Sequence, residues 1–128
     1  AEQYIQSIEV EAKLVIDMAK TMIYPAATRY ISDLGMTISS MMEMGIELDN
    51  STTATVAGET NAMMSAVAKL CEVMEKQDFS STEEHMQFCA NEIRDLMDEV
   101  RVHADALEAE VADELWPLPK YHEMLFIR

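Results

Sequence analysis

Helix-breaking residues are rare in this chain, and this scarcity constrains the fold more than any other feature. Only three glycines and three prolines occur in 128 residues. Apolar residues near the N-terminus recur at alternating steps of four and three, which is the spacing of one face of a helix. The members of this stripe are Ile8, Ala12, Val15, Ala19, Met22 and Ala26. Strand-like alternation is absent, so the sequence predicts an all-α fold.

Two short segments interrupt the helical pattern. Residues 45–53 combine glycine, Asx and hydroxyl residues, and residues 77–80 precede a capping box that runs from Ser81 to Glu84. These breaks predict three long helices at about 2–46, 53–76 and 81–115. We expect Pro25 to kink the first helix rather than divide it. Because short loops make neighbouring helices antiparallel, the sequence predicts an elongated antiparallel bundle.

The C-terminal segment 116–128 is apolar although it cannot continue a helix. Pro117 and Pro119 lack amide donors and fix φ, so we expect the third helix to stop near residue 115. A disordered tail would be polar, whereas this segment should dock on another surface. The predicted docking residues are Trp116, Leu118, Tyr121, Leu125 and Phe126. We therefore expect one domain, with a bundle over 1–115 and an extended docking tail over 116–128.

Both ends of the chain resemble one known family. The sequence Trp-Pro-Leu-Pro-Lys-Tyr-His-Glu-Met-Leu-Phe at 116–126 is similar to the C-terminus of type III glutamine synthetases, where it follows a Glu-rich helix. Residues 4–30, with Met-Ala-Lys at 18–20 and Tyr-Pro-Ala at 24–26, are similar to the helix that follows the family's catalytic domain. The chain opens inside a predicted helix without an initiator Met, so we expect a domain excised from a larger enzyme.

The resemblance implies a parent enzyme that joins ammonia to glutamate at the expense of ATP. It also implies divalent metal ions such as Mg²⁺ and an assembly of stacked hexameric rings. The family's metal carboxylates, nucleotide pocket and glutamate-binding arginine belong to its catalytic domain, and none corresponds to a position here. The expectation is therefore a segment without catalytic, cofactor or metal residues, which serves assembly, docking or regulation. Its partners would be the catalytic domain and neighbouring subunits of the homo-oligomer.

Charge excludes several classes of partner. Twenty-four Asp and Glu against nine Lys and Arg give a formal charge of −15, which repels phosphate backbones and anionic lipid, so we expect neither nucleic acid nor a membrane as partner. Glu110, Asp113 and Glu114 lie near the predicted end of the third helix, where the helix dipole disfavours anions. They form either a solvated face or an interface with basic residues of another surface. The two cysteines make no disulfide framework and are expected to be core thiols of a cytoplasmic protein.

The first helix also carries apolar residues away from its main stripe: Val10, Leu14, Ile16, Met18 and Ile23. A surface helix needs only one apolar stripe. Either this helix is buried between others of the bundle, or the rest of the parent enzyme covers it.

Two functions from other classes remain open. Methionines gather just before Gly45, at Met36, Met41, Met42 and Met44. Such clusters form adaptable surfaces, as in an acidic helical adaptor that binds partner helices, although core filling explains them as well. His85, Cys89 and Glu92 lie at successive turns of the third helix and could bind a metal ion, but structural zinc usually needs four ligands.

Overall fold

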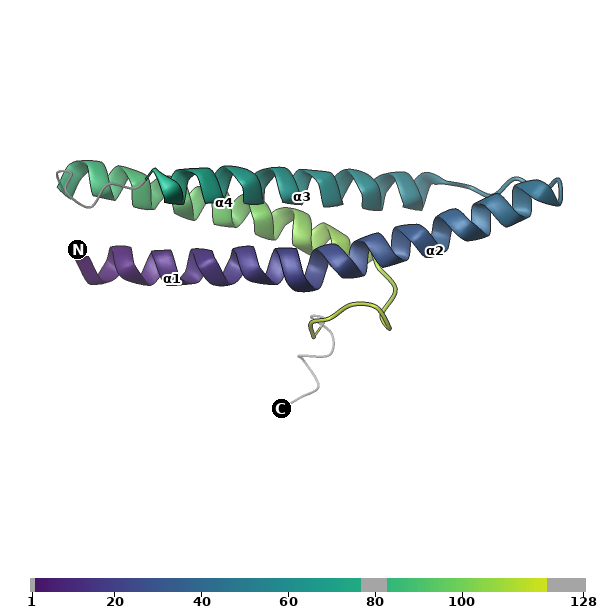
Figure 1. The fold of residues 1–128 in the computed structure, drawn as a ribbon, viewed down its shortest axis with the longest axis horizontal. Helices are drawn as coiled ribbons and strands as arrows, with labels where there is room; N and C mark the ends of the chain where they lie inside the picture. Colours follow the sequence, from purple (N-terminus) through teal and green to yellow (C-terminus); the bar gives the residue numbers. More distant parts are fainter. Residues whose placement is uncertain (1, 77–82, 120–128) are drawn as a thin grey trace.

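Three helical segments run antiparallel along one long axis in the computed structural model, which describes residues 2–76 and 83–119 (Figure 1). The first segment consists of α1 (Glu2–Met18), a π-helix η1 (Ala19–Ile23) and α2 (Tyr24–Glu43), which follow one another without a loop. α3 (Ser51–Glu75) returns alongside it, and α4 (Glu83–Glu110) runs in the direction of α1. No strand occurs among the described residues. The predicted all-α bundle of three long helical segments is confirmed.

The π-helix lies directly before the proline that the sequence places inside the first helix. The Tyr24 amide donates to the carbonyl of Ala19, one residue further back than in an α-helix. In a regular α-helix the ring of Pro25 would clash with the carbonyl of Thr21. A wider turn at this place accommodates the ring, so the helix continues through Pro25. The kink itself stays a prediction.

The first break is a glycine-terminated helix end. Gly45 has φ +77°, a conformation that favours glycine because it has no Cβ. The amide of Gly45 donates to the carbonyl of Met42 at 3.0 Å, and the amide of Ile46 donates to that of Met41 at 2.9 Å. This pair of bonds is a Schellman motif, which satisfies carbonyls that the end of a helix leaves free. α2 therefore ends at Glu43, close to the predicted boundary at 46.

The last helix ends earlier than expected, at Glu110 instead of residue 115. The boundary predicted from Pro117 and Pro119 was wrong, because the helix ends before it reaches these prolines. Its last turn contains no basic residue, and Glu108 and Glu110 oppose the dipole there. The chain turns at Ala112, whose carbonyl accepts the amides of Leu115 and Trp116 at 3.0 and 3.2 Å. This turn brings Trp116 back onto the bundle.

The core divides into two clusters of buried residues. One joins α1, α3 and α4 near the α3–α4 connection: Ile8, Ala12, Leu70, Ala90, Ile93 and Met97. The other joins η1, α2, α3, α4 and Trp116, and includes Ala19, Ile23, Ala27, Val56, Met63, Val67, Val100 and Leu107. Between Ala27 and Val56, by contrast, no residue is buried. α2 packs on α3 but not comparably on α4, so its outer part and the start of α3 form an arm only two helices thick (Figure 1).

Candidate functional site

The structure describes two of the five predicted docking residues of the tail, and both pack on the chain's own core. Trp116 is buried, with 9% of its surface exposed, and belongs to the chain's own core. Leu118 is half-buried and packs against the same cluster. Tyr121, Leu125 and Phe126 lie outside the described residues. The structure therefore uses Trp116 to attach the beginning of the tail to the bundle.

The buried indole of Trp116 has no polar partner within the described part of the chain. Its Nε1 atom is inaccessible to solvent and makes no hydrogen bond among the described residues. A buried N–H without an acceptor costs roughly 1–3 kcal/mol. Apolar packing must therefore offset this cost. Trp116 serves as an apolar anchor rather than as a polar one.

A groove lies between α1 and α4 beside this anchor. Its volume is about 330 Å³, and its apolar walls come from Leu14, Val15, Met18, Ala19, Ile23, Val100, Ala104, Trp116 and Leu118. Leu14 is 58% exposed, and Val10, one turn before it on α1, is 67% exposed. The groove and these two residues form a continuous apolar surface, which we call the α1 face.

The first helix carries apolar residues outside its main stripe, which either pack within the bundle or await cover by another surface. Their exposure shows that both explanations apply. Ile23 is buried, and Ile16 and Met18 are half-buried in the bundle. Val10 and Leu14 remain in solvent. Burial between helices therefore accounts for part of the set, and only a further surface could cover the rest.

Carboxylates border the groove of the α1 face. Glu11, Asp105 and Glu108 line the groove, together with one cation, Arg101. Glu110, Asp113 and Glu114, the predicted acidic interface residues, are all exposed.

Within the described part of the chain, no helix has the length and apolar character needed to cross a membrane.

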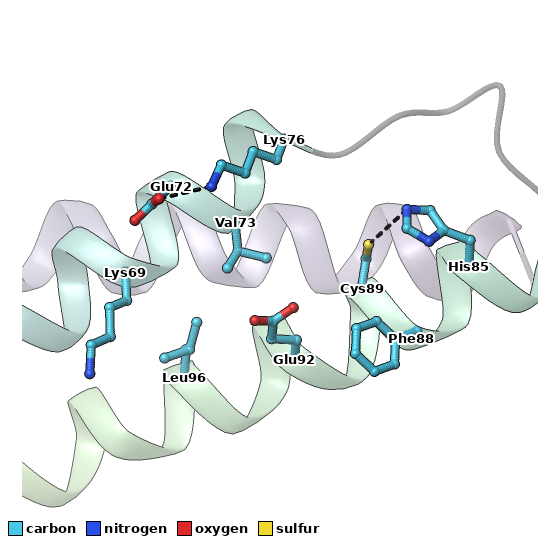
Figure 2. A pocket seen from close by; sticks show the side chains of 9 residues that line it. All are labelled: Lys69, Glu72, Val73, Lys76, His85, Phe88, Cys89, Glu92 and Leu96. Atoms are coloured by element: carbon cyan, nitrogen blue, oxygen red, sulfur yellow. Dashed lines mark hydrogen bonds and ion pairs between the residues drawn. The ribbon is translucent and has the colours of Figure 1, made fainter.

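A second cavity of about 390 Å³ lies between the end of α3 and the start of α4 (Figure 2). Cys89 Sγ lies 3.7 Å from His85 Nε2, and the two side chains point toward each other. Glu92 lines the same cavity one turn further along α4. The described residues nevertheless contain no group of three His, Cys, Asp or Glu placed to hold a metal ion. The metal site considered for His85, Cys89 and Glu92 therefore does not assemble, and these residues do not fit a Mg²⁺ or Zn²⁺ centre.

Cys71 and Cys89 are free thiols.

Two of the charged groups at this cavity, Lys76 and Glu72, form an ion pair. Lys76 Nζ donates to Glu72 Oε1 at 2.9 Å (Figure 2). This hydrogen bond, and then the attraction of the ammonium group, lower the pKa of Glu72; the same bond raises the pKa of Lys76. Both groups thus stay charged over a wider pH range. The arrangement stabilises an ion pair on the surface and does not prepare a general acid or base.

One polar contact between helices was missed by the sequence analysis. His103 Nδ1 on α4 lies 2.7 Å from Glu59 Oε2 on α3, and both side chains are partly buried. Periodicity on one helix suggests Glu99 as the neighbour of His103, but the structure pairs it with a residue on another helix. No local sequence signal identifies this partner, because the two residues are 44 positions apart.

The methionine cluster lies mostly on the surface. Met36, Met42 and Met44 are 67%, 65% and 64% exposed, and Met41 is half-buried on the outer part of α2. Met41 belongs to neither of the two core clusters, and the other three are available for contact.

Comparison with known proteins shows which family this chain resembles. A profile of the glutamine synthetase C-terminal domain matches residues 1–42. The type-3 glutamine synthetase of Dictyostelium discoideum is 30% identical over 136 aligned residues, which cover 99% of this chain and 18% of that protein. The resemblance to the C-terminal domain of type III glutamine synthetases is therefore confirmed. The glutamine synthetase of Bacteroides fragilis (strain YCH46) is 26% identical over 99% of this chain and 19% of its own length. No solved structure gives a significant match.

The comparisons with glutamine synthetases also extend the resemblance to the middle of the chain. The sequence alone matched the family only at the two ends, whereas both relatives align along almost the entire chain. The chain spans less than a fifth of the length of each relative. The segment matched by the family profile contains α1, η1 and all but the last residue of α2, and so includes Val10 and Leu14 of the α1 face.

Proposed function

We propose that this chain is a non-catalytic C-terminal domain of a glutamine synthetase, and that it serves docking and oligomer assembly. The parent reaction would be the ATP-dependent ligation of ammonia to glutamate in the cytoplasm, with Mg²⁺ and ATP held elsewhere in the enzyme. The observation that carries the proposal is the exposure of Val10 and Leu14 on the helix that the family profile matches.

The energetic argument concerns uncovered apolar area. Fully burying a Val or Leu side chain stabilises a protein by roughly 1.5–3 kcal/mol relative to leaving it in water. Val10 and Leu14 gain little of this in the isolated bundle. They adjoin a groove whose wall includes Trp116 and Leu118, so a single partner surface could cover all of them. The remainder of the enzyme, or a neighbouring subunit, would supply that surface.

The acidic residues at the end of α4 and in the turn after it fit the same proposal. Glu110, the last residue of α4, is exposed where the helix dipole disfavours an anion, and Asp113 and Glu114 are exposed in the turn that follows. Contact with Arg or Lys of the covering surface would compensate for this cost and select its orientation. The tail residues Tyr121, Leu125 and Phe126 would extend the same contact.

The test is assembly of the full-length enzyme that carries this domain. Val10→Glu combined with Leu14→Glu should weaken the oligomer in sedimentation velocity, because two charges enter an apolar interface. Val102→Glu is the matched control, since Val102 is 63% exposed on α4 and does not line the groove. An unchanged oligomer for the double variant would contradict the proposal, as would equal weakening by the control.

A second variant separates the tail from the bundle core. Deletion of residues 120–128 retains Trp116, whereas deletion from residue 116 would also remove a core side chain. We expect the shorter deletion to weaken assembly of the full-length enzyme. The same deletion in the isolated chain should change its circular dichroism little. The chain alone should form no glutamine from ATP, glutamate, ammonia and Mg²⁺, and turnover above a blank would refute the assignment of catalysis to another part.

A further inference from the structure

The far end of the molecule exposes a second apolar surface, unrelated to the α1 face. The arm formed by the outer part of α2 and the start of α3 contains no buried residue between Ala27 and Val56. Its end holds a hollow of about 420 Å³, with apolar walls from Ile38, Met42, Ile46 and Leu48. We call this hollow with its walls the arm tip. The hollow is lined by the end of α2 and the segment that leads to α3, and α1 and α4 do not extend to this end of the molecule, so the bundle itself cannot cover these side chains (Figure 1).

The arm tip has a fixed backbone. The Schellman bonds of Gly45 and Ile46 to Met42 and Met41 lock the end of α2. On the other side, Asp49 accepts the amide of Ser51 at 3.0 Å and its hydroxyl at 2.8 Å, which fixes the entry to α3. The apolar walls are therefore held on a formed scaffold, while the thioether of Met42 can adapt its shape.

Charge selects the kind of partner. Glu47 lines the hollow. Two further exposed carboxylates, Glu43 and Asp49, lie four residues before and two residues after Glu47 in the sequence. The sequence has no Lys or Arg between Arg29 and Lys69. A second copy of this chain would bring the same carboxylates to the contact, so like charges would oppose self-association. The complementary surface must be apolar at its centre and basic at its edge.

We propose that the arm tip docks a basic amphipathic helix of a partner protein. Such a helix places apolar side chains at i, i+3 and i+4 into the hollow and directs Lys or Arg toward Glu43, Glu47 and Asp49. Methionine walls suit this mode because they repack around different apolar side chains. The inference is independent of the assembly role of the α1 face, since no residue is shared between the two surfaces.

The experiment uses the 128-residue chain and a synthetic amphipathic helical peptide of Leu and Lys. A scrambled peptide of the same composition, which has no apolar face, controls for the general attraction of a chain with charge −15. At about 150 mM salt, where the screening length is about 8 Å, binding is followed by the methyl signals of isotope-labelled methionines. We expect the Met42 signal to shift, whereas the fully buried Met63 and Met97 stay in place.

Two sets of substitutions locate the contact. Met42→Gln with Ile46→Gln should raise the Kd by roughly ten-fold or more, which corresponds to about 1.4 kcal/mol. Phe88→Gln with Val102→Gln replaces two similarly exposed apolar residues on α4 and should leave the Kd unchanged. Equal affinity for the scrambled peptide, or an unchanged Kd in the first variant, would overturn the proposal. A concentration-dependent shift of Met42 without peptide would also overturn it, because a second copy would then occupy the arm tip.

Discussion

Replacement of Trp116 tests whether the start of the tail belongs to the bundle. Trp116→Ala removes a side chain that is only 9% exposed and packs in the main core cluster. Truncating a buried Trp to Ala typically costs about 3–5 kcal/mol. Trp116 also borders the open α1–α4 groove, so the new void would join a solvent-filled space. We therefore expect a loss near the lower limit, about 3 kcal/mol.

Trp116→Phe should behave differently because it removes the unpaired indole N–H. The smaller ring loses part of the apolar contact, but removal of a buried donor without a partner returns roughly 1–3 kcal/mol. The two effects oppose each other. We expect the free energy of unfolding to stay within about 1.5 kcal/mol of the original value.

Urea unfolding followed by circular dichroism measures both effects without relying on the single Trp. With a slope near 2 kcal/mol per M, Trp116→Ala should lower the midpoint by roughly 1.5 M. Its helix content should persist, because α4 ends at Glu110 before the anchor. A change below about 1 kcal/mol would refute the placement of Trp116 in the core. Equal losses for Phe and Ala would instead show that Nε1 has a hydrogen-bond partner in solution.

Three further experiments test other parts of the fold. A double-mutant cycle with His103→Ala and Glu59→Ala should give a coupling of about 0.5–1.5 kcal/mol in urea unfolding, and no coupling would mean that the 2.7 Å contact does not form. Hydrogen bonds from the Ser51 hydroxyl and amide lower the pKa of Asp49, so its stabilising effect is present at neutral pH and is lost as the pH falls through that lowered pKa, below the ordinary 3.8. Asp49→Asn should therefore lower the melting temperature at neutral pH but not at strongly acidic pH, and a pH-independent difference would contradict this. Pro25→Ala should not clearly raise the melting temperature, because closing the π-turn would rotate α2 by about 100° relative to α1 and break its packing on α3.

The sequence predicted the helical elements well because their signals are local. The break at 45–53 contains the glycine that ends α2, and the helical spacing of apolar residues located α3 within two residues at its start. The π-turn was not predicted, since Pro25 indicates a disturbance without specifying how the backbone accommodates it. The end of α4 was misplaced because the prolines set only the latest possible stop. The observed end at Glu110 reflects the unfavourable acidic residues in the last turn and the turn that buries Trp116 in the core.

The candidate surfaces were harder to predict because they depend on tertiary contacts. The tail was correctly recognised as apolar, but sequence alone could not show that Trp116 anchors on its own bundle. The pairing of His103 with Glu59 likewise depends on the register between α3 and α4. His85, Cys89 and Glu92 share one side of a helix, yet the described residues contain no group of three such side chains placed to hold a metal ion.

Apolar periodicity identifies the face of a helix that packs but not how many helices cover it. The stripe through Ala19 and Ala26 continues through Leu34 and Ile38 without a change in pattern. The first pair is buried, because η1 and the start of α2 lie in the core with α3 and α4. The second pair is only half-buried, because α4 does not accompany α2 along the arm. A similar sequence signal therefore describes a core in one half of the helix and an incomplete interface in the other, and only the length and direction of α4 distinguish the two.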